Sequence, residues 1–373
     1  MQISQPKYDC AIVGGGLAGL CLAIQLAKQK HSVILFEKNE YPFHKVCGEY
    51  VSNESWNFLE SLGLPLSKMN LPIINQLGIS STKGFMLETP LKMGGFGISR
   101  FTMDHQLSLI AKQHGVVIFE NCKVNDVQLT NGIYTIYTMK GQFHAKIACG
   151  SFGKHAPVFT EKSTKQRPNY IGVKYHIKTN LNENRIELHN FKDGYCGVSK
   201  VDDDKYCLCY LTTTKNLSDN NKNINQLEEN VLCKNPYLKK YFTESEFLFD
   251  KPLTISQITF DKKSAYSSHI FLLGDAAGAI APLCGNGMSM GMRASKLLTI
   301  LLNSYLNNEI TKNEAISLYQ TQWNQNFSNR INTGYYLQQL LGKNQLTHLS
   351  LKFLNSSPKL LQKIISLTHG QPF

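Results

Sequence analysis

The chain has 373 residues, of which 42% are apolar and 18% are charged, and its formal net charge is +12. This composition is typical of a globular protein that is long enough for more than one domain. The positive charge suits an anionic cofactor, a nucleic acid or an anionic membrane surface. However, the basic residues are scattered and form no nucleic-acid-binding motif, so we expect no nucleic-acid partner.

The N-terminal segment has the pattern of a buried strand, a glycine turn and a helix. Residues 11–13 are Ala-Ile-Val, and the turn reads Gly14-x-Gly16-x-x-Gly19. The first glycine permits a sharp turn, the second lets a pyrophosphate approach the backbone, and the third lets the helix pack closely on the strand. A second buried strand at 32–36 ends at Glu37, where a carboxylate can bind ribose hydroxyls. We therefore predict a dinucleotide site.

Beyond this unit, helical and strand patterns are separated by glycine, proline and asparagine turns. In chain order we predict a helix at 52–62, a β-rich stretch at 71–98, a helix at 103–114, a buried strand at 116–119, a hairpin of 124–129 with 133–138, strands within 168–213 and at 252–260, a strand at 270–273, and helices at 288–303 and 313–341. Within 171–178, apolar residues alternate with others such as Lys174 and His176, which predicts one buried and one wetter face. The Asn- and Lys-rich stretch 216–225 is predicted to be an exposed loop.

A second glycine-rich region follows the predicted strand at 270–273. It reads Gly274-Asp275-Ala-Ala-Gly and then Pro282-Leu-Cys-Gly285-Asn-Gly287-Met. An aspartate at the end of a buried strand can accept a hydrogen bond from a ribityl hydroxyl, and the later glycines let the backbone lie against a flat ring. The helix that begins there offers N–H groups to a carbonyl edge of that ring. Together with the N-terminal turn, this region favours a flavin over a nicotinamide-only site.

These motifs, with Arg100 before a helix, resemble those of the FAD-dependent oxidoreductases of the p-hydroxybenzoate hydroxylase fold. Within that group, Lys45-Val46-Cys47-Gly48-Glu49 resembles the geranylgeranyl reductase branch. The resemblance implies an α/β fold: a Rossmann-like FAD-binding domain, an inserted antiparallel β-sheet substrate domain, and C-terminal helices. The corresponding ranges are 1–70, 99–165 and 262–305 for the FAD-binding domain, 71–98 and 166–261 for the substrate domain, and 306–373 for the helical region.

The resemblance also implies a set of residues that bind FAD. The turn at 14–19 would hold the pyrophosphate, Glu37 the adenosine ribose, Arg100 the phosphate or ribityl region, and Asp275 the ribityl chain. The backbone of Val124 would meet the adenine, and residues 285–288 would meet the isoalloxazine. The full set is Gly14, Gly16, Leu17, Ala18, Gly19, Glu37, Lys38, Arg100, Val124, Asp275, Gly285, Asn286, Gly287 and Met288. Arg100 could instead form a surface ion pair, and Val124 could be a core strand residue.

Two departures from the family pattern concern the electron donor and the active-site loop. Phe152 stands where many hydroxylases of this fold carry an aspartate that contacts both FAD and NADPH, so typical NADPH docking is in doubt. NADPH or NADH is still the expected transient donor. Phe43 replaces an arginine of the loop pattern. Flavin halogenases of related fold carry a Trp-x-Trp-x-Ile-Pro motif, which a chain with only Trp56 and Trp323 cannot contain.

Cys47 and Lys45 are the candidate catalytic residues. A thiol at the flavin could donate a proton to a carbanion-like centre after hydride transfer, and a nearby lysine would favour its thiolate form. Alternatively, Cys47 fills space beside the ring, and Cys284 is also expected near the flavin.

The ten cysteines show neither C-x-x-C nor zinc-ligand spacing, so we predict reduced thiols, no metal and a cytoplasmic protein without a signal peptide. The tail at 346–367 is apolar and basic. It forms either a helix pair that packs over the substrate domain or a surface that lies peripherally on a membrane.

Three functions are open on the sequence. The first is FAD-dependent reduction of C=C bonds in an apolar polyprenyl- or polyketide-like substrate. The second is an NAD(P)H-dependent flavin monooxygenase that hydroxylates an aromatic or quinone-like substrate, because the fold does not fix the chemistry. The third is a non-catalytic redox flavoprotein.

Overall fold

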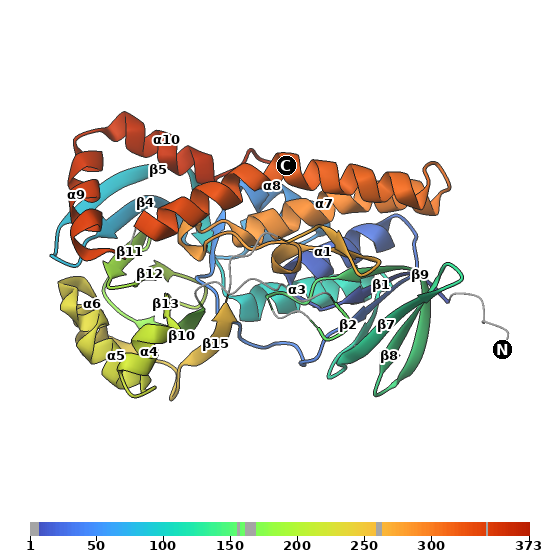
Figure 1. The fold of residues 1–373 in the computed structure, drawn as a ribbon, viewed down its shortest axis with the longest axis horizontal. Coiled ribbons are helices and arrows are strands. Elements are labelled where there is room, and N and C mark those ends of the chain that lie inside the picture. The colour runs from blue at the N-terminus through green and yellow to red at the C-terminus, as the bar shows by residue number, and fades with distance from the viewer. Residues whose placement is uncertain (1–6, 155–156, 161–168, 259–262, 341) are drawn as a thin grey trace.

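A computed structural model of the chain describes residues 7–154, 157–160, 169–258, 263–340 and 342–373. It shows two β-sheets toward opposite ends of an elongated molecule, with long helices running along one side (Figure 1). The α/β architecture predicted from the sequence is confirmed.

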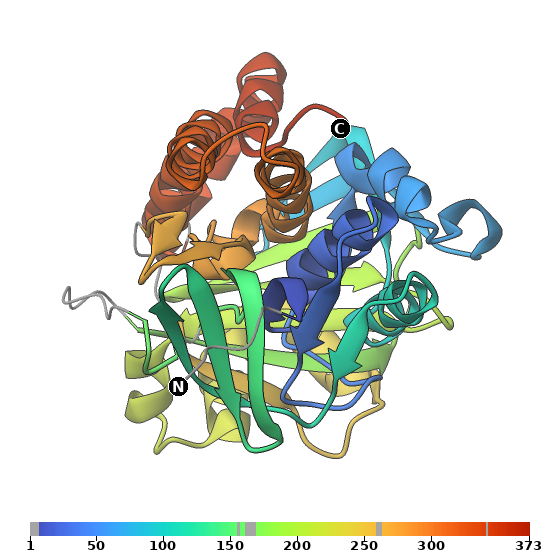
Figure 2. The ribbon, with the colours of Figure 1, turned by 90° about the vertical axis from the view of Figure 1, so that its right-hand side faces the viewer.

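The eight-stranded sheet contains the N-terminal strand. Its members are β1 (Tyr8–Val13), β2 (Val33–Phe36), β6 (Val117–Phe119), β7 (Val124–Thr130), β8 (Ile133–Thr138), β9 (Gly141–Gly150), β16 (Tyr266–Ser267) and β17 (Ile270–Leu272). The order is β16-β17-β9-β1-β2-β6, and β7 and β8 extend from β9 as an antiparallel meander, drawn in green in Figure 2. Parallel neighbours on both sides of β1 bury it and place its C-terminal end, with the glycine turn, at the middle of the sheet edge.

One prediction for this sheet was wrong and another was confirmed. The strand at 116–119 was predicted to be buried, but β6 is an edge strand and Val117 is 39% exposed. The predicted hairpin is confirmed, with Asn131 and Gly132 both at positive φ in the two-residue turn that joins β7 to β8.

The nine-stranded sheet forms the other end of the molecule. Its members are β3 (Tyr50–Ser52), β4 (Ile73–Ser80), β5 (Met86–Gly97), β10 (Tyr170–Lys178), β11 (Arg185–Phe191), β12 (Gly194–Lys200), β13 (Tyr206–Thr213), β14 (Glu246–Phe247) and β15 (Leu253–Ile258). The order is β14-β10-β13-β12-β11-β4-β5-β3, with β15 beside β10. Among the described strand pairs, β4–β11 is parallel and the others are antiparallel. The parallel pair arises because the chain enters this sheet twice, before and after the passage through the eight-stranded sheet.

The helices cover both sheets. They are α1 (Leu17–Lys28), α2 (Trp56–Leu62), α3 (Arg100–Gln113), α4 (Thr214–Asp219), α5 (Ile224–Asn230), α6 (Pro236–Glu244), α7 (Gly287–Leu306), α8 (Lys312–Leu340), α9 (Asn344–Asn355) and α10 (Pro358–Thr368), with short 3₁₀ turns η1 (Asn53–Ser55), η2 (Leu66–Lys68), η3 (Leu232–Lys234), η4 (Gly274–Ala276) and η5 (Pro282–Cys284). Residue 341 of the predicted helix 313–341, and residues 259–260 of the predicted strand 252–260, lie outside the described residues. No helix within the described ranges is long and apolar enough to cross a membrane.

Two predictions for the nine-stranded sheet were wrong. The stretch 216–225 is not a loop but contributes to α4 and α5, because the side chains of Thr213 and Asn223 accept hydrogen bonds from the first-turn N–H groups of these helices. The face of β10 that carries Lys174 and His176 is not wet, since both residues are at most 1% exposed. That face turns toward the loop 45–49, whose Glu49 binds both side chains.

Candidate functional site

The glycine turn has the close contacts that the motif predicts. Gly14 has φ +105°, and a Cβ there would lie 2.4 Å from the Ser151 carbonyl oxygen. A Cβ on Gly19 would lie 2.3 Å from the Gly14 carbonyl oxygen, so helix α1 packs directly on the end of β1. Gly16 is different, because the nearest atom to its added Cβ is 3.7 Å away. The turn is therefore tight on the protein side and open at the residue where a pyrophosphate would approach.

Segments that are far apart in the sequence meet at this turn. A Cβ on Gly274, in η4, would lie 3.5 Å from the Ala18 Cβ, and a Cβ on Gly291, in α7, would lie 3.4 Å from the same atom. The Cβ added at Gly291 would also lie 3.6 Å from the Cα of Gly274. The N-terminal turn and the 274–291 region thus form one cradle. The first N–H groups of α1 and α7 have no side-chain cap, because Gly16 has no side chain and the Asn286 side chain accepts no hydrogen bond from them.

A pair of cations lies at the open side of the turn. Arg100 binds Asp104 through Nε and Nη2 at 2.8 and 2.7 Å, and Lys45 Nζ binds Asp104 Oδ2 at 3.0 Å. Lys45 Nζ and Arg100 Nη2 are 3.7 and 4.0 Å from the Cβ position of Gly16. We call Lys45, Arg100 and Asp104 the cation cluster. It carries two positive charges against one negative charge, and the excess faces the position predicted for phosphate.

Burial and charge act in opposite directions on the titration of this cluster. Burial by itself raises the pKa of the Asp104 carboxyl, but Arg100 and Lys45 lower it below its ordinary value. Burial likewise lowers the pKa of the Arg100 guanidinium, but Asp104 raises it well above its ordinary value. Asp104 and Arg100 are therefore both charged at neutral pH. The alternative that Arg100 forms a surface ion pair does not describe this geometry, because its side chain is 11% exposed.

The predicted adenosine-side residues are spread over three environments. Glu37 is buried, accepts from the Gly15 N–H at 3.0 Å, and also accepts from Asn39 N and Nδ2. Its carboxylate thus lies beside the glycine turn. Lys38 is exposed, and Val124 is a buried residue at the start of β7.

The second glycine region forms the other wall. The side chain of Asp275 is 34% exposed, and its Oδ2 lies 4.0 Å from Lys154 Nζ. Gly285 has φ +65°, and a Cβ there would lie 3.2 Å from the Tyr50 ring. Gly287 and Met288 begin α7, so their backbone N–H groups have no helical partners. The stretch 285–288 thus combines two glycines with N–H groups that have no partner within the helix, and its contact with a flat ring stays a prediction.

Asn286 has a different neighbour. It is fully buried, and its Nδ2 donates to the Thr368 carbonyl at 2.6 Å. The residues after Thr368 also contact α7 and η1. Arg293 Nη1 of α7 donates to Gln371 O, and Phe373 N donates to Glu54 O of η1. A Cβ on Gly370 would lie 2.0 Å from Arg330 Nη2, so this segment fits tightly. Residues 368–373 therefore support the turn at 285–288, a role that no local sequence pattern indicates.

Cys47 lies at this turn. Its Sγ is 3.7 Å from Met288 Sδ, and its backbone carbonyl accepts from the Cys207 thiol at 3.2 Å. Cys47 is partly exposed, whereas Cys207 and Cys284 are buried. Lys45 does not join it, because the Lys45 ammonium binds Asp104 at the glycine turn. The structure thus places Cys47 beside Met288, which is predicted to contact the flavin, and Lys45 beside the glycine turn, which is predicted to bind the phosphates.

Sequence reasoning missed a second buried group behind the same loop. Glu49 is fully buried and accepts from Lys174 Nζ at 2.5 Å, from His176 Nε2 at 2.7 Å and from Arg100 N at 2.7 Å. We call Glu49, Lys174 and His176 the sheet cluster. Burial raises the pKa of Glu49, but His176 and Lys174 lower it below its ordinary value. The only sequence indication was the polar alternation along 171–178, which we interpreted as a wet face.

Two members of the sheet cluster, Glu49 and His176, have the spacing of a metal site together with Cys207. The ligand atoms of Glu49, His176 and Cys207 lie within 4.8 Å of one another. However, the Lys174 ammonium already supplies the positive charge that a cation would bring, and it occupies Glu49 Oε1. Cys207 donates to the Cys47 carbonyl and is therefore a thiol rather than a thiolate ligand. We interpret the cluster as a buried ion pair.

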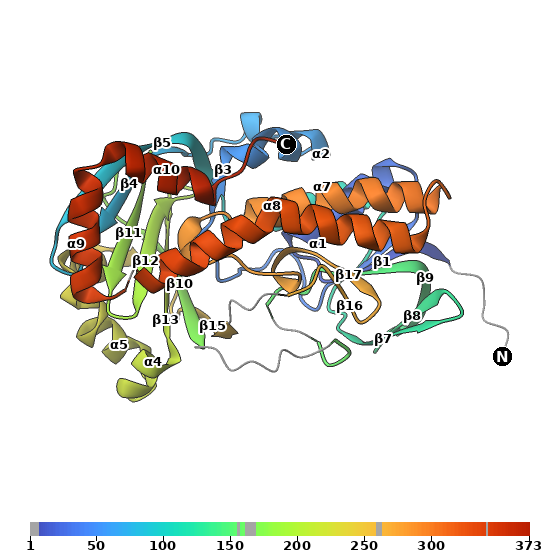
Figure 3. The same ribbon diagram turned by 45° about the horizontal axis from the view of Figure 1, so that its top comes forward.

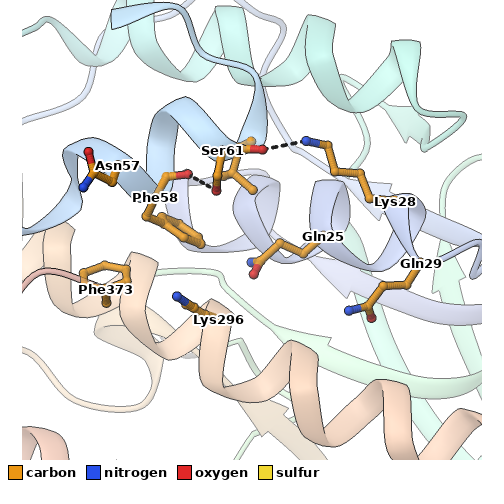
Figure 4. A pocket seen from close by; sticks show the side chains of 9 residues that line it. Gln25, Lys28, Gln29, Asn57, Phe58, Ser61, Lys296 and Phe373 are labelled. Atoms are coloured by element: carbon orange, nitrogen blue, oxygen red, sulfur yellow. Dashed lines mark hydrogen bonds between the residues drawn. The ribbon is translucent and has the colours of Figure 1, made fainter.

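A cavity of about 410 Å³ lies at the opposite end of α1 (Figure 4). Its lining includes Gln25, Lys28, Phe58, Lys296 and Phe373. Lys28 does not point into open space as a free cation, because its Nζ donates to the Ser61 carbonyl at 2.7 Å. The glycine turn is at the first residues of α1 and this cavity is at the last ones, so the cavity is separate from the cradle.

Comparisons with known proteins agree with this geometry. A family model described as an NAD(P)-binding Rossmann-like domain matches residues 12–49, which contain the glycine turn and Glu37. Conditioned medium factor receptor 1 of Dictyostelium discoideum is 22% identical over 348 residues, covering 85% of this chain and 67% of its own.

Two named enzymes are also similar over most of their lengths. A digeranylgeranylglycerophospholipid reductase of Methanococcus vannielii is 20% identical and covers 87% of this chain and 84% of its own. A kynurenine 3-monooxygenase of Flavobacterium psychrophilum is 24% identical, and the match covers 81% of this chain and 74% of the monooxygenase.

Solved structures share the whole architecture. A flavoprotein/dehydrogenase from Cytophaga hutchinsonii matches with a TM-score of 0.78 at 17% identity, covering 96% of this chain and 92% of its own. A flavin-dependent brominase matches with a TM-score of 0.77 at 17% identity, and the match covers 97% of this chain and 93% of the brominase chain. The chain thus has the fold of these flavoproteins, and its sequence is similar to those of the named reductase and monooxygenase.

Proposed function

We propose that the protein reduces C=C bonds of an apolar, polyprenyl- or polyketide-like substrate. The observation that carries the proposal is the partly exposed Cys47 thiol, which lies 3.7 Å from Met288 at the start of α7. Reduction of a C=C bond needs a hydride on one carbon and a proton on the other. A thiol beside the ring-binding turn is a suitable proton donor.

The residues of the cradle fit FAD. The open position at Gly16, flanked by Lys45 and Arg100, suits the pyrophosphate, and Glu37 beside the turn suits the adenosine ribose. The partly exposed Asp275 suits the ribityl chain, and the free N–H groups at 287–288 suit the ring. Bound in this cradle, FAD would supply the hydride. The chain itself would hold the cofactor, exclude water and deliver the proton.

An apolar cluster adjoins the turn at 285–288. Tyr195 and Leu211, from the nine-stranded sheet, are buried together with Ala279 and with Leu283 of η5. We expect an apolar substrate to bind beside this cluster with its double bond near Cys47. The buried charges of the sheet cluster are internally paired, so they do not require a polar substrate.

NADPH or NADH is the proposed transient donor. Phe152 packs against Gly150, whose added Cβ would lie 2.5 Å from the Phe152 ring. An apolar side chain therefore occupies the position at which related hydroxylases carry an aspartate. We expect the donor to bind in a different manner from theirs, or reduced flavin to be supplied by another reductase. Stopped-flow reduction by each nicotinamide separates these two cases.

The decisive experiment is anaerobic. The purified protein is photoreduced, mixed with an apolar lipid extract in D₂O, and the products are analysed by mass spectrometry. The proposal predicts products that gain two hydrogens, both as deuterium, because the N–H of reduced flavin and the thiol S–H each exchange with solvent. Cys47→Ala should slow reoxidation of the flavin about 100-fold or more without changing its spectrum. Cys233→Ala is the matched control, because Cys233 is a similarly half-buried thiol in η3. A product that gains one oxygen in air would refute the reductase function.

Hydroxylation is the second candidate. The observation that favours it is the similarity to a kynurenine 3-monooxygenase, which covers 81% of this chain. It predicts that an aromatic or quinone-like compound stimulates NAD(P)H and oxygen consumption together. Turnover that is unchanged without oxygen excludes it.

A further inference from the structure

Helices α9 and α10 carry an exposed surface that has no role in the cradle. Its apolar members are Leu346, Leu349, Phe353, Leu360 and Leu367, with exposed fractions of 46%, 64%, 62%, 40% and 51%. Lys352, Lys359 and Lys363 are also exposed on the same two helices. We call these eight residues the basic–apolar face. Exposed apolar groups gathered in this way mark interaction sites.

On each of the two helices, these residues lie opposite a residue that is buried against the nine-stranded sheet. Leu351 of α9 and Leu361 of α10 are buried in one cluster over β4 and β5, and Gln362 binds Thr89 and Pro90 of β5. At about 100° per residue, Leu349 and Phe353 lie on the side of α9 opposite Leu351. By the same spacing, Lys359 and Lys363 lie opposite Leu361, with Leu360 and Leu367 beside them. The basic–apolar face is therefore on the sides of α9 and α10 opposite the residues packed on β4 and β5, and both helices lie at the end of the molecule that holds the nine-stranded sheet (Figure 3).

The charge on this part of the chain has one sign. Residues 315–373 contain no aspartate or glutamate. α9 and α10 thus carry no acidic residue, and the last acidic residue of the chain is Glu314 in the first turn of α8. A self-associated pair of such faces would set lysines against lysines, which disfavours a second copy as the occupant. Apolar side chains flanked by unpaired lysines are complementary to a surface that combines hydrocarbon with negative charge.

We propose that the basic–apolar face binds an anionic lipid membrane in the plane of its headgroups. Leu349, Phe353, Leu360 and Leu367 would enter the headgroup–acyl boundary, and the lysines would lie at the phosphate level. The proposal does not depend on the reductase function. It concerns where the protein is held rather than what reaction it catalyses.

The test is flotation of the full chain with vesicles of phosphatidylcholine alone and of phosphatidylcholine with phosphatidylglycerol. We expect binding to the anionic vesicles that weakens with salt, and little binding to the neutral ones. The variant Lys352→Gln/Lys359→Gln/Lys363→Gln should reduce the partition coefficient by roughly 100-fold. Leu349→Gln/Phe353→Gln should reduce it with the lysines intact.

The matched control is Lys123→Gln/Lys239→Gln/Lys240→Gln, which removes three exposed lysines elsewhere and should bind like the wild type. Flavin absorbance and the melting temperature verify that each variant is folded. The proposal is overturned if the wild type ignores anionic vesicles, or if the control variant loses as much binding as the α9–α10 variant. It is also overturned if the wild type is a dimer in light scattering and Leu349→Gln/Phe353→Gln makes it monomeric, because a second copy then covers the face.

Discussion

The cation cluster and the sheet cluster are joined by one short loop, yet they differ in charge balance. Lys45 belongs to the first and Glu49 to the second. In the cation cluster, two cations share Asp104, and the excess positive charge faces the open position at Gly16. In the sheet cluster, Glu49 and Lys174 balance, both are fully buried, and the His176 ring donates to the same carboxylate. An uncompensated charge next to an open turn indicates a ligand, whereas a compensated charge inside the protein holds two segments together.

The largest expected effect is on the sheet cluster. Lys174→Met leaves the Glu49 carboxylate buried without its cation, so we expect a loss of about 3–5 kcal/mol in the free energy of unfolding. Denaturant unfolding measures it. Lys178→Met is the control on the same strand, because that lysine is 60% exposed and its ion pair should contribute little. A loss below about 1 kcal/mol for Lys174→Met would show that the pair is not a structural link.

A third buried carboxylate, with no cation, extends the comparison. Glu228 of α5 accepts from the hydroxyls of Tyr175 and Tyr210, and burial raises its pKa from 4.5 to about 7. Because the folded protein holds the proton more tightly, its contribution to stability is full below pH 4.5 and is lost as the pH rises through about 7. Glu228→Gln should therefore be about 1–3 kcal/mol more stable than the wild type at pH 8 and about equal at pH 4.5. The exposed neighbour variant Glu229→Gln should show no such pH dependence, and an equal gain at both pH values would contradict the assignment.

In the cation cluster, the main effect should be on affinity for the cofactor. Arg100→Gln removes a charged donor at the phosphate position, so we expect FAD to bind about 10–100-fold more weakly. Fluorescence titration of the apoprotein measures this, together with the salt dependence of binding. Arg185→Gln, which alters an arginine paired with Glu88 and Glu187 in the other sheet, should leave FAD affinity unchanged. Equal affinities of Arg100→Gln and the wild type would remove Arg100 from the phosphate site.

The smallest effect is expected for Lys45, whose side chain is 24% exposed and more flexible than Arg100. Lys45→Gln should weaken FAD binding by about fivefold, because a partly solvated lysine contributes about 1 kcal/mol. The rate of the chemical step should stay near that of the wild type when FAD is saturating. If Lys45→Gln instead lowers that rate as strongly as Cys47→Ala, the lysine acts on the thiol and not on the phosphate. Lys30→Gln, an exposed lysine at the end of α1, is the control.

The sequence alone determined the fold class and the glycine turn, and it predicted FAD-binding residues in the second glycine region. These features depend on short-range spacing: three glycines between a buried strand and a helix, and an aspartate at the end of another strand. The alternation along 171–178 was also visible, but its polar face was assigned to water. The packing of the loop 45–49 against β10 shows that this face is buried instead. Lys174 can be buried there because it pairs with Glu49, which is 125 residues away in the chain.

The same reason explains the other features that the tertiary structure decided. No local sequence pattern distinguishes Asp104 from other helical residues, and only the folded structure shows that it binds both Arg100 and Lys45. Lys45 and Cys47 are two residues apart, but the fold sends one side chain to the glycine turn and the other to Met288. Asn286 was assigned to the cofactor, yet its amide supports residues 368–373. Local patterns specify backbone geometry, whereas the partner of a buried polar group is set by whichever distant segment packs against it.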